Sequence, residues 1–309
     1  MDTFLGIFVP AIVFFCIISI ASLSGLFSER VGIVNIAIEG MMIVGATFYG
    51  LFGQIFQITS PWMQIPLLII ASAATGLFAL LHGIVTIKLK GDHIISGVAL
   101  NLLAPAISII FLKIFGSANR FNSPTQELAL SSNSLNDIRN VISLKLFLVL
   151  AIGITTLIVL NKTRWGLRMK AIGENPQAAD VVGINVNSFK WQGVFISGLL
   201  AGIAGGIFFQ WRGSVFSGGV EGIGFLALAV LIMGQWKSSL IFVFSIVFAF
   251  IFSTSQQIGA GQGVFNDFKD YSRLISTTPY IFTILILIFS SKNSKAPAAV
   301  GQPYDKSKR

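Results

Sequence analysis

Residues 4–27 read FLGIFVPAIVFFCIISIASLSGLF, a stretch without a single charged side chain. An α-helix needs about 20 mostly apolar residues to cross the hydrocarbon core of a bilayer. Inside that core the backbone must satisfy its own hydrogen bonds, so such a run must be helical. The stretch is too long for the apolar region of a secretion signal and no basic segment precedes it. We therefore interpret it as a first transmembrane helix.

The rest of the chain repeats this pattern. Apolar residues make up 54% of the 309 residues and charged residues only 11%, whereas a soluble domain carries about 25% charged residues. We predict an all-α polytopic membrane bundle, with residues 1–291 as one transmembrane domain and residues 292–309 as a basic tail. About nine spans are expected, at residues 4–27, 33–57, 64–87, 94–115, 144–160, 193–211, 222–236, 238–258 and 278–290.

The positions of Lys and Arg predict the orientation, because cytoplasmic connections carry an excess of these residues. Fourteen of the 21 lie in one set of connections and seven in the opposite set. The richer set includes the inner loop 161–192 and the tail, so these are predicted to be cytoplasmic. The N-terminus and the polar loop 116–143 are then outside. The tail is polar and basic, and we expect it to be disordered.

The sequence offers little for catalysis. Cys16 is the only cysteine, and His82 and His93 are the only histidines, so we expect no disulfide within the chain and no metal cluster. The phosphate-binding pattern G-x-x-x-x-G-K-[ST] does not occur. Because the basic residues that give the net charge of +9 follow the membrane topology, we expect membrane lipid as a partner and no nucleic acid. We predict a non-catalytic protein without a cofactor of its own.

The inner loop 161–192 predicts a short helix outside the membrane. Asn175 is a good N-cap, Pro176 suits the first helical position, and Gly183 is a natural residue to end the helix. Ala178 and Ala179 give this helix small side chains. Two interpretations are open: a plain connector at the membrane surface, or the point where a soluble partner pushes on the membrane domain.

A few polar residues fall inside predicted spans. Ionisable groups there are costly and usually face a cavity or the interior of the bundle. Glu39 is the one acid well inside a span, and it either lines a path or serves as a helix cap or interhelical partner. Asn35 and Asn101 are candidates for the same path, or for bonds between helices. The triplets IEG at 38–40 and VEG at 220–222 suggest an inverted repeat or a chance similarity. An inverted repeat makes Glu221 the fourth candidate for the substrate path.

Small residues gather in the predicted span 193–211. Residues 198–206 read GLLAGIAGG, a pattern that lets two membrane helices approach closely. We predict that this segment is a packing face and has no part in a site.

Four stretches carry a resemblance to a known family. They are AIGENPQAADVVGINV (171–186), LFSERVGIVNIAIEGMMIVGA (26–46), GDHIISGVALNLLA (91–104) and GGVEGIGFLALAVLIMG (218–234). They resemble ABC-transporter permeases of the branched-chain amino acid, simple sugar and nucleoside group. The second stretch is most similar to the nucleoside-type members. One departure is Gln235-Trp236-Lys237, which follows Gly234 where members often have a small or Pro-containing turn.

The resemblance implies an inverted-repeat permease of the type II importer fold in a bacterial cell membrane. Its partners would be a cytoplasmic ATPase that binds ATP and Mg²⁺, an external binding protein or lipoprotein, and a second permease. A heterodimer is favoured and a homodimer is the alternative. The resemblance also implies that the inner loop couples the chain to the ATPase, through Gly173, Glu174, Asn175, Pro176, Ala178, Ala179 and Gly183.

The function expected from this resemblance is nucleoside import by alternating access. The first alternative is a permease for simple sugars such as ribose. The second, from a different class, is a secondary transporter driven by an ion gradient. Such transporters generally need membrane-embedded acids or cation sites. Glu39 is the only embedded acid expected here, which disfavours this alternative.

Overall fold

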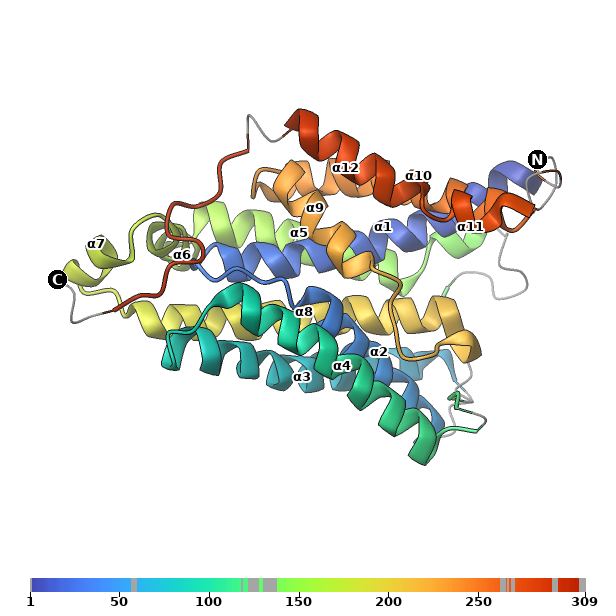
Figure 1. Ribbon diagram of the computed structural model, residues 1–309, viewed down its shortest axis with the longest axis horizontal. Coiled ribbons are helices and arrows are strands. Elements are labelled where there is room, and N and C mark those ends of the chain that lie inside the picture. The colour runs from blue at the N-terminus through green and yellow to red at the C-terminus, as the bar shows by residue number, and fades with distance from the viewer. Residues whose placement is uncertain are drawn as a thin grey trace.

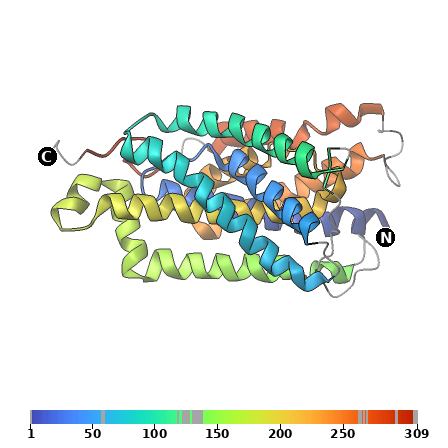
Figure 2. The same cartoon turned by 90° about the horizontal axis from the view of Figure 1, so that it is seen from below.

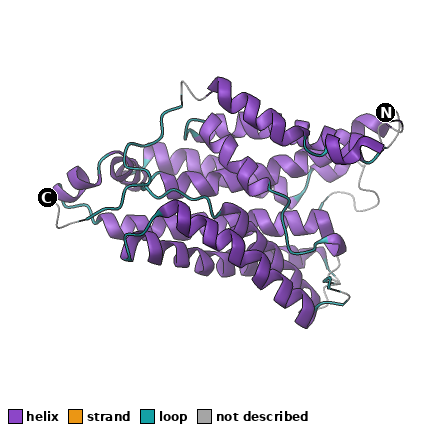
Figure 3. Cartoon of the chain, in the orientation of Figure 1, coloured by secondary structure: helices purple, strands orange, loops and turns teal. Residues whose placement is uncertain are grey.

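The computed structural model describes residues 2–56, 60–117, 119–121, 128–129, 138–261, 265, 267, 270–290 and 294–305. These residues form helices joined by loops, with no β-strand among them (Figure 3). The all-helical prediction is therefore confirmed for the described residues. Much of the predicted outer loop 116–143 lies outside them, as do residues 292–293 and 306–309 of the tail.

Within the described residues, seven helices are long and apolar enough to cross a membrane. They are α1 (Asp2–Glu29), α2 (Ile38–Ile55), α3 (Gln64–Gly83), α4 (His93–Phe115), α5 (Leu144–Lys162), α8 (Val186–Arg212) and α10 (Ser238–Gly259). Two shorter apolar helices are α9 (Ile223–Met233) and α12 (Thr278–Ser290), and the small helices are α6 (Arg164–Glu174), α7 (Pro176–Val181) and α11 (Ser272–Ile275). The number of nine spans stays a prediction, because α9 and α12 are too short to cross by length alone.

Two predicted spans are wrong at their starts or ends. The span predicted from residue 33 becomes helical only at Ile38, and the span predicted over 222–236 shortens to Ile223–Met233. Positive φ values interrupt a right-handed helix. Gly32 (+83°) lies before α2, Glu221 (+58°) and Gly222 (+79°) lie before α9, and Gln235 (+51°) and Trp236 (+54°) lie just after α9. Irregular backbone therefore precedes both helices and also ends α9 early.

The glycine-rich segment of α8 is the packing face that the sequence predicts. Helix α8 packs against α1, α2 and α3. A methyl group at Gly202 would lie 2.6 Å from the Ala71 carbonyl oxygen of α3, and one at Gly205 would lie 2.1 Å from the Met42 carbonyl oxygen of α2. Only glycine permits such close backbone approach.

The two termini lie at opposite ends of the bundle (Figure 1). Helix α7 extends beyond the other helices at the end that carries the C-terminus, here called the C-terminal end (Figures 1 and 2). Termini at opposite ends are what the predicted orientation requires. The direction of insertion itself stays a prediction.

The expectation of a disordered tail is wrong for residues 294–305. This segment runs across the C-terminal end, where the Ala299 amide donates to the Gly173 carbonyl at 2.8 Å and the Gly301 amide donates to the Gly32 carbonyl at 3.1 Å. Lys90 and Asp305 form an ion pair at 2.9 Å. The prediction failed because backbone groups of distant loops, which composition does not reveal, hold the tail.

Candidate functional site

The N-terminal ends of α2 and α9 meet inside the bundle. Glu39, in the first turn of α2, accepts hydrogen bonds from the Gly222 amide at 2.8 Å and the Gly224 amide at 2.7 Å. These amides belong to the start of α9, whose N-terminal N–H groups have no acceptor within the helix. The Glu39 side chain of one interrupted helix thus caps the other.

Close approach of the two backbones makes this contact possible. A methyl group at Gly224 would lie 2.5 Å from the Glu39 Cα atom, so glycine is required there. Glu39 is only 8% exposed, and a buried carboxylate is tolerated when charge-assisted hydrogen bonds satisfy it.

Asn101 forms hydrogen bonds with the α2 side of the same junction. Its Oδ1 accepts from the Gly40 amide at 2.8 Å, and its Nδ2 donates to the Ile36 carbonyl at 2.9 Å. One side chain of α4 therefore binds both the irregular segment before α2 and the first turn of α2. Asn101 is half-buried, so it is partly accessible at this junction.

Glu221 lies on the exposed side of the junction. Its carboxylate pairs with Arg212 at the end of α8, and its backbone carbonyl accepts from the Tyr280 hydroxyl of α12. The structure thus brings Glu39, Asn101 and the segment of Glu221 together. Arg212 and Tyr280 were missed, because no sequence signal pairs either of them with Glu221.

Asn35, the fourth predicted path residue, lies apart in a buried cluster. Its Nδ2 donates to the Ser197 hydroxyl of α8 at 2.7 Å, and that hydroxyl also bonds Ser24 of α1 at 3.0 Å. Asn35 is fully buried. In this conformation Asn35 joins the segment before α2 to α8, and its place in a path stays a prediction.

At the junction two helices of opposite direction start close together. Helices α2 and α9 run in opposite directions from it (Figure 1). Gln54, next to the last residue of α2, donates to the Phe115 carbonyl. Trp236, just beyond α9, donates to Glu29, the last residue of α1. Helix N-termini carry a partial positive charge. Interrupted helices whose ends converge within the membrane commonly form substrate sites.

Helix α7 of the inner loop is formed and capped as the sequence predicts. The Asn175 side chain accepts from the Ala178 amide at 2.9 Å, and Pro176 is the first helical residue. At the other end Gly183 has a φ of +84° and donates to the Asp180 carbonyl at 3.0 Å, while Ile184 donates to the Ala179 carbonyl at 3.0 Å. This pair of bonds is a Schellman motif.

The predicted coupling residues divide between two faces of the inner loop. Gly173, Pro176 and Ala179 are buried, whereas Glu174, Asn175, Ala178 and Gly183 are exposed. A methyl group at Gly173 would lie 2.5 Å from the Arg30 carbonyl oxygen. The buried set therefore attaches the loop to the bundle, and the exposed set is accessible to a partner.

The tip of α7 carries exposed apolar side chains. Val181 is 73% exposed and Val182 is 74% exposed, beside the exposed Gly183. Neighbouring exposed apolar residues at a projecting tip are typical of a surface that another protein covers.

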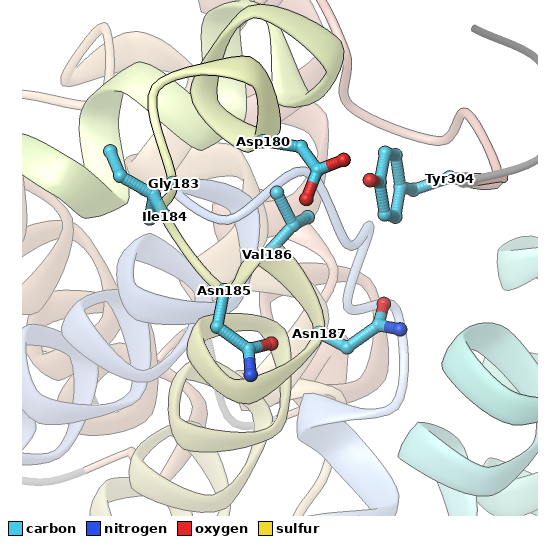
Figure 4. Close-up of a pocket in the computed structure, with 7 residues that line it drawn as sticks. All are labelled: Asp180, Gly183, Ile184, Asn185, Val186, Asn187 and Tyr304. Atoms are coloured by element: carbon cyan, nitrogen blue, oxygen red, sulfur yellow. The ribbon is translucent and has the colours of Figure 1, made fainter.

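A cavity of about 290 Å³ lies between α7 and the start of α8 (Figure 4). In Figure 4 the Asp180 carboxylate points toward the Tyr304 ring of the tail. The other lining residues are Gly183, Ile184, Asn185, Val186 and Asn187. The recess and the α7 tip adjoin each other, so together they offer a shaped surface for a soluble partner.

Replacing Asn175 with Ala should loosen α7 without unfolding the bundle. Removing an N-cap side chain costs about 1 kcal/mol, and a six-residue helix has little other stability of its own. We expect proteolytic cleavage within 161–192 to become about fivefold faster. Asn187→Ala removes the same amide from a position that caps no helix, and an equal acceleration there would contradict the capping role.

Comparisons with known proteins agree with these features. Residues 7–289 match the family model described as the branched-chain amino acid transport system / permease component. The chain is 36% identical to the nucleoside ABC transporter permease protein NupC of Lactococcus lactis, covering 93% of this chain and 92% of that protein. It is 36% identical to the guanosine ABC transporter permease protein NupQ of Bacillus subtilis, covering 99% and 98%. A second Bacillus subtilis guanosine permease, NupP, is 28% identical and covers 69% and 64%. No solved structure matches the chain.

Proposed function

Because the chain belongs to the family of permease components of branched-chain amino acid transport systems, we propose that it imports nucleosides, driven by ATP on a partner. It is a multi-pass membrane protein and the permease subunit of an ABC transporter. The names of NupC and NupQ support nucleosides as the substrate class. The observation that carries the proposed mechanism is the junction at Glu39, where the N-terminal ends of α2 and α9 meet and the two helices run in opposite directions.

In this proposal, the energy of ATP hydrolysis reaches the membrane domain through the inner loop. The sequence has no P-loop pattern of its own, so a cytoplasmic ATPase with Mg²⁺ would hydrolyse ATP. That ATPase would bind the exposed side of α7, and closing of its dimer would push α7. Helix α7 leads directly into α8, which makes α8 the element that carries the motion into the membrane.

The packing of α8 supports alternating access as the proposed mechanism. Helix α8 touches the α2 backbone through Gly205, so a shift of α8 displaces α2 relative to α9. Such a shift strains or breaks the Glu39 bonds to Gly222 and Gly224. Opening and closing of this junction would expose Asn101 and Glu221 first to one side of the membrane and then to the other.

The remaining partners are an external binding protein or lipoprotein and a second permease. Two guanosine permeases from one bacterium, NupQ and NupP, match this chain with unequal similarity. Two unlike permeases in one organism support a heterodimer, with a homodimer as the alternative.

The test is ATP-dependent uptake of labelled guanosine and ribose by vesicles that contain the chain and its ATPase. We expect guanosine uptake, with Gly183→Trp reducing it at least about tenfold because the indole obstructs docking of the ATPase. A side chain at Gly183 meets nothing within 4 Å, but its φ of +84° strains any other residue.

Gly183→Ala is the matched control, since it carries the same backbone strain of about 1–2 kcal/mol without the bulk. Equal loss in both variants would assign the effect to loop conformation and not to docking. Uptake of ribose alone would move the substrate to the sugars, and uptake that follows an ion gradient without ATP would refute the import mechanism.

A further inference from the structure

A second cavity, of about 330 Å³, lies at the C-terminal end among α5, α6 and the start of α10. Three of its lining residues are cations: Arg30, Lys170 and Lys237. The other lining residues are Leu157, Leu160, Asn161, Trp236, Ser238 and Ser239. No lining residue is acidic, so the cavity has an excess of positive charge.

Protein acceptors do not neutralise these cations. Arg30 donates to the Trp236 carbonyl, and Lys170 donates to the Asn161 amide oxygen at 2.6 Å. Both acceptors are uncharged. The Arg30 Nε atom is buried and has no hydrogen-bond partner. Among the residues that the structure describes, no carboxylate lies within ion-pair distance of Arg30, Lys170 or Lys237.

The pKa values of two of these cations are lowered. Burial lowers the pKa of the Arg30 guanidinium, although the charge of Glu174 acts in the opposite direction. Burial and the charge of Arg30 lower the pKa of Lys170. Each cation would therefore be stabilised by an anion placed between them.

Helix α10 adds donors to the same cavity. It starts at Ser238, and the preceding Lys237 provides no side-chain cap. The first N–H groups of a helix lack intrahelical acceptors, and the N-terminus carries a partial positive charge. Ser238 and Ser239 line the cavity, so hydroxyl groups, a helix start and three cations converge there. Phosphate is the anion that such a set of donors suits.

The surroundings indicate the source of that phosphate. Ile158 of α5 is 53% exposed and Val243 of α10 is 54% exposed. Exposed aliphatic side chains on membrane-spanning helices face lipid chains. Both helices are in contact with the cavity, so a molecule with a phosphate head and apolar chains matches the whole surface.

We propose that this cavity binds the headgroup phosphate of an anionic phospholipid, whose acyl chains lie along the exposed apolar faces of α5 and α10. Basic pockets between membrane helices on the cytoplasmic side are suited to anionic headgroups. The lipid links α10 to α6, the helix that precedes α7. It thereby supports the base of the inner loop, whether or not the transported substrate is a nucleoside.

The experiment measures lipids retained by the full-length chain in native mass spectra from micelles containing phosphatidylglycerol or phosphatidylcholine. We expect wild type to retain phosphatidylglycerol selectively. Lys170→Gln with Lys237→Gln should weaken that retention about tenfold, since each basic residue contributes to anionic-lipid binding. The matched control is Arg164→Gln with Arg168→Gln, which removes two exposed charges of α6 outside the cavity and should leave retention within about twofold of wild type.

Three outcomes would overturn the proposal. One is equal retention by wild type and the Lys170/Lys237 variant, and another is equal loss in the Arg164/Arg168 control. The third is displacement of the lipid by inorganic phosphate or by the bound ATPase, which would assign the cavity to a free anion or to a protein partner. The readout does not depend on transport, so it stands separately from the proposed function.

Discussion

Glu39→Gln is expected to reduce ATP-dependent nucleoside uptake by about tenfold or more, because it breaks the junction between α2 and α9. The carboxylate oxygens of Glu39 accept separate bonds from the Gly222 and Gly224 amides. A glutamine has one acceptor oxygen, and its amide group would face a second N–H donor. Each lost charge-assisted bond is worth about 1.5–3 kcal/mol, enough to open the start of α9.

The measurement is uptake at matched amounts of folded protein, with the thermal midpoint recorded in the same lipid. Asp267→Asn is the control, since it makes the same carboxylate-to-amide change at an exposed residue. Normal uptake by Glu39→Gln would remove Glu39 from the transport path and leave the permease assignment intact. A loss of uptake explained wholly by unfolding would make Glu39 a structural cap only.

Gly205→Ala is expected to destabilise the whole bundle. The added methyl group would lie 2.1 Å from the Met42 carbonyl oxygen and 2.8 Å from the Ala46 amide nitrogen. Both atoms belong to the α2 backbone, which cannot rotate away as a side chain would. Alanine favours a helix by about 1 kcal/mol over glycine, yet we expect a net loss of about 3 kcal/mol because α2 and α8 must separate.

Thermal unfolding in detergent, monitored by tryptophan fluorescence, tests this expectation. The matched control is Gly219→Ala, where an added methyl group meets nothing within 4 Å and the midpoint should change little. A Gly205→Ala midpoint equal to or above that of wild type would show that α2 and α8 do not pack as closely as the structure has them.

Features that depend on neighbouring residues could be predicted from the sequence. The long apolar runs that form α1, α4 and α10 follow from hydropathy. The capping of α7 by Asn175 and Gly183 follows from residues within one turn of the helix ends. The glycine face of α8 was also predictable, because small residues at regular spacing along one helix indicate close packing against a neighbouring helix.

Hydropathy misplaced the start of α2 and the end of α9. Ile33 and Trp236 are apolar and buried, so their side chains gave no sign of irregular backbone. The positive φ value at Gly32 is compatible with glycine, but glycine also occurs inside the regular helix α8. Composition likewise could not show that distant carbonyl groups hold the tail.

The sequence by itself therefore determined that this protein is a helical membrane permease, with a short capped helix in its inner loop. Hydropathy, caps and family motifs act over a few residues, and each is visible in the printed sequence. Only the tertiary structure decided that Glu39 caps α9, because the two partners are 183 positions apart. It also placed Asn35 beside the Ser197 hydroxyl and Asn101 at the junction, since the packing of α8 and α4, and not residue type, sets which partner each side-chain amide reaches.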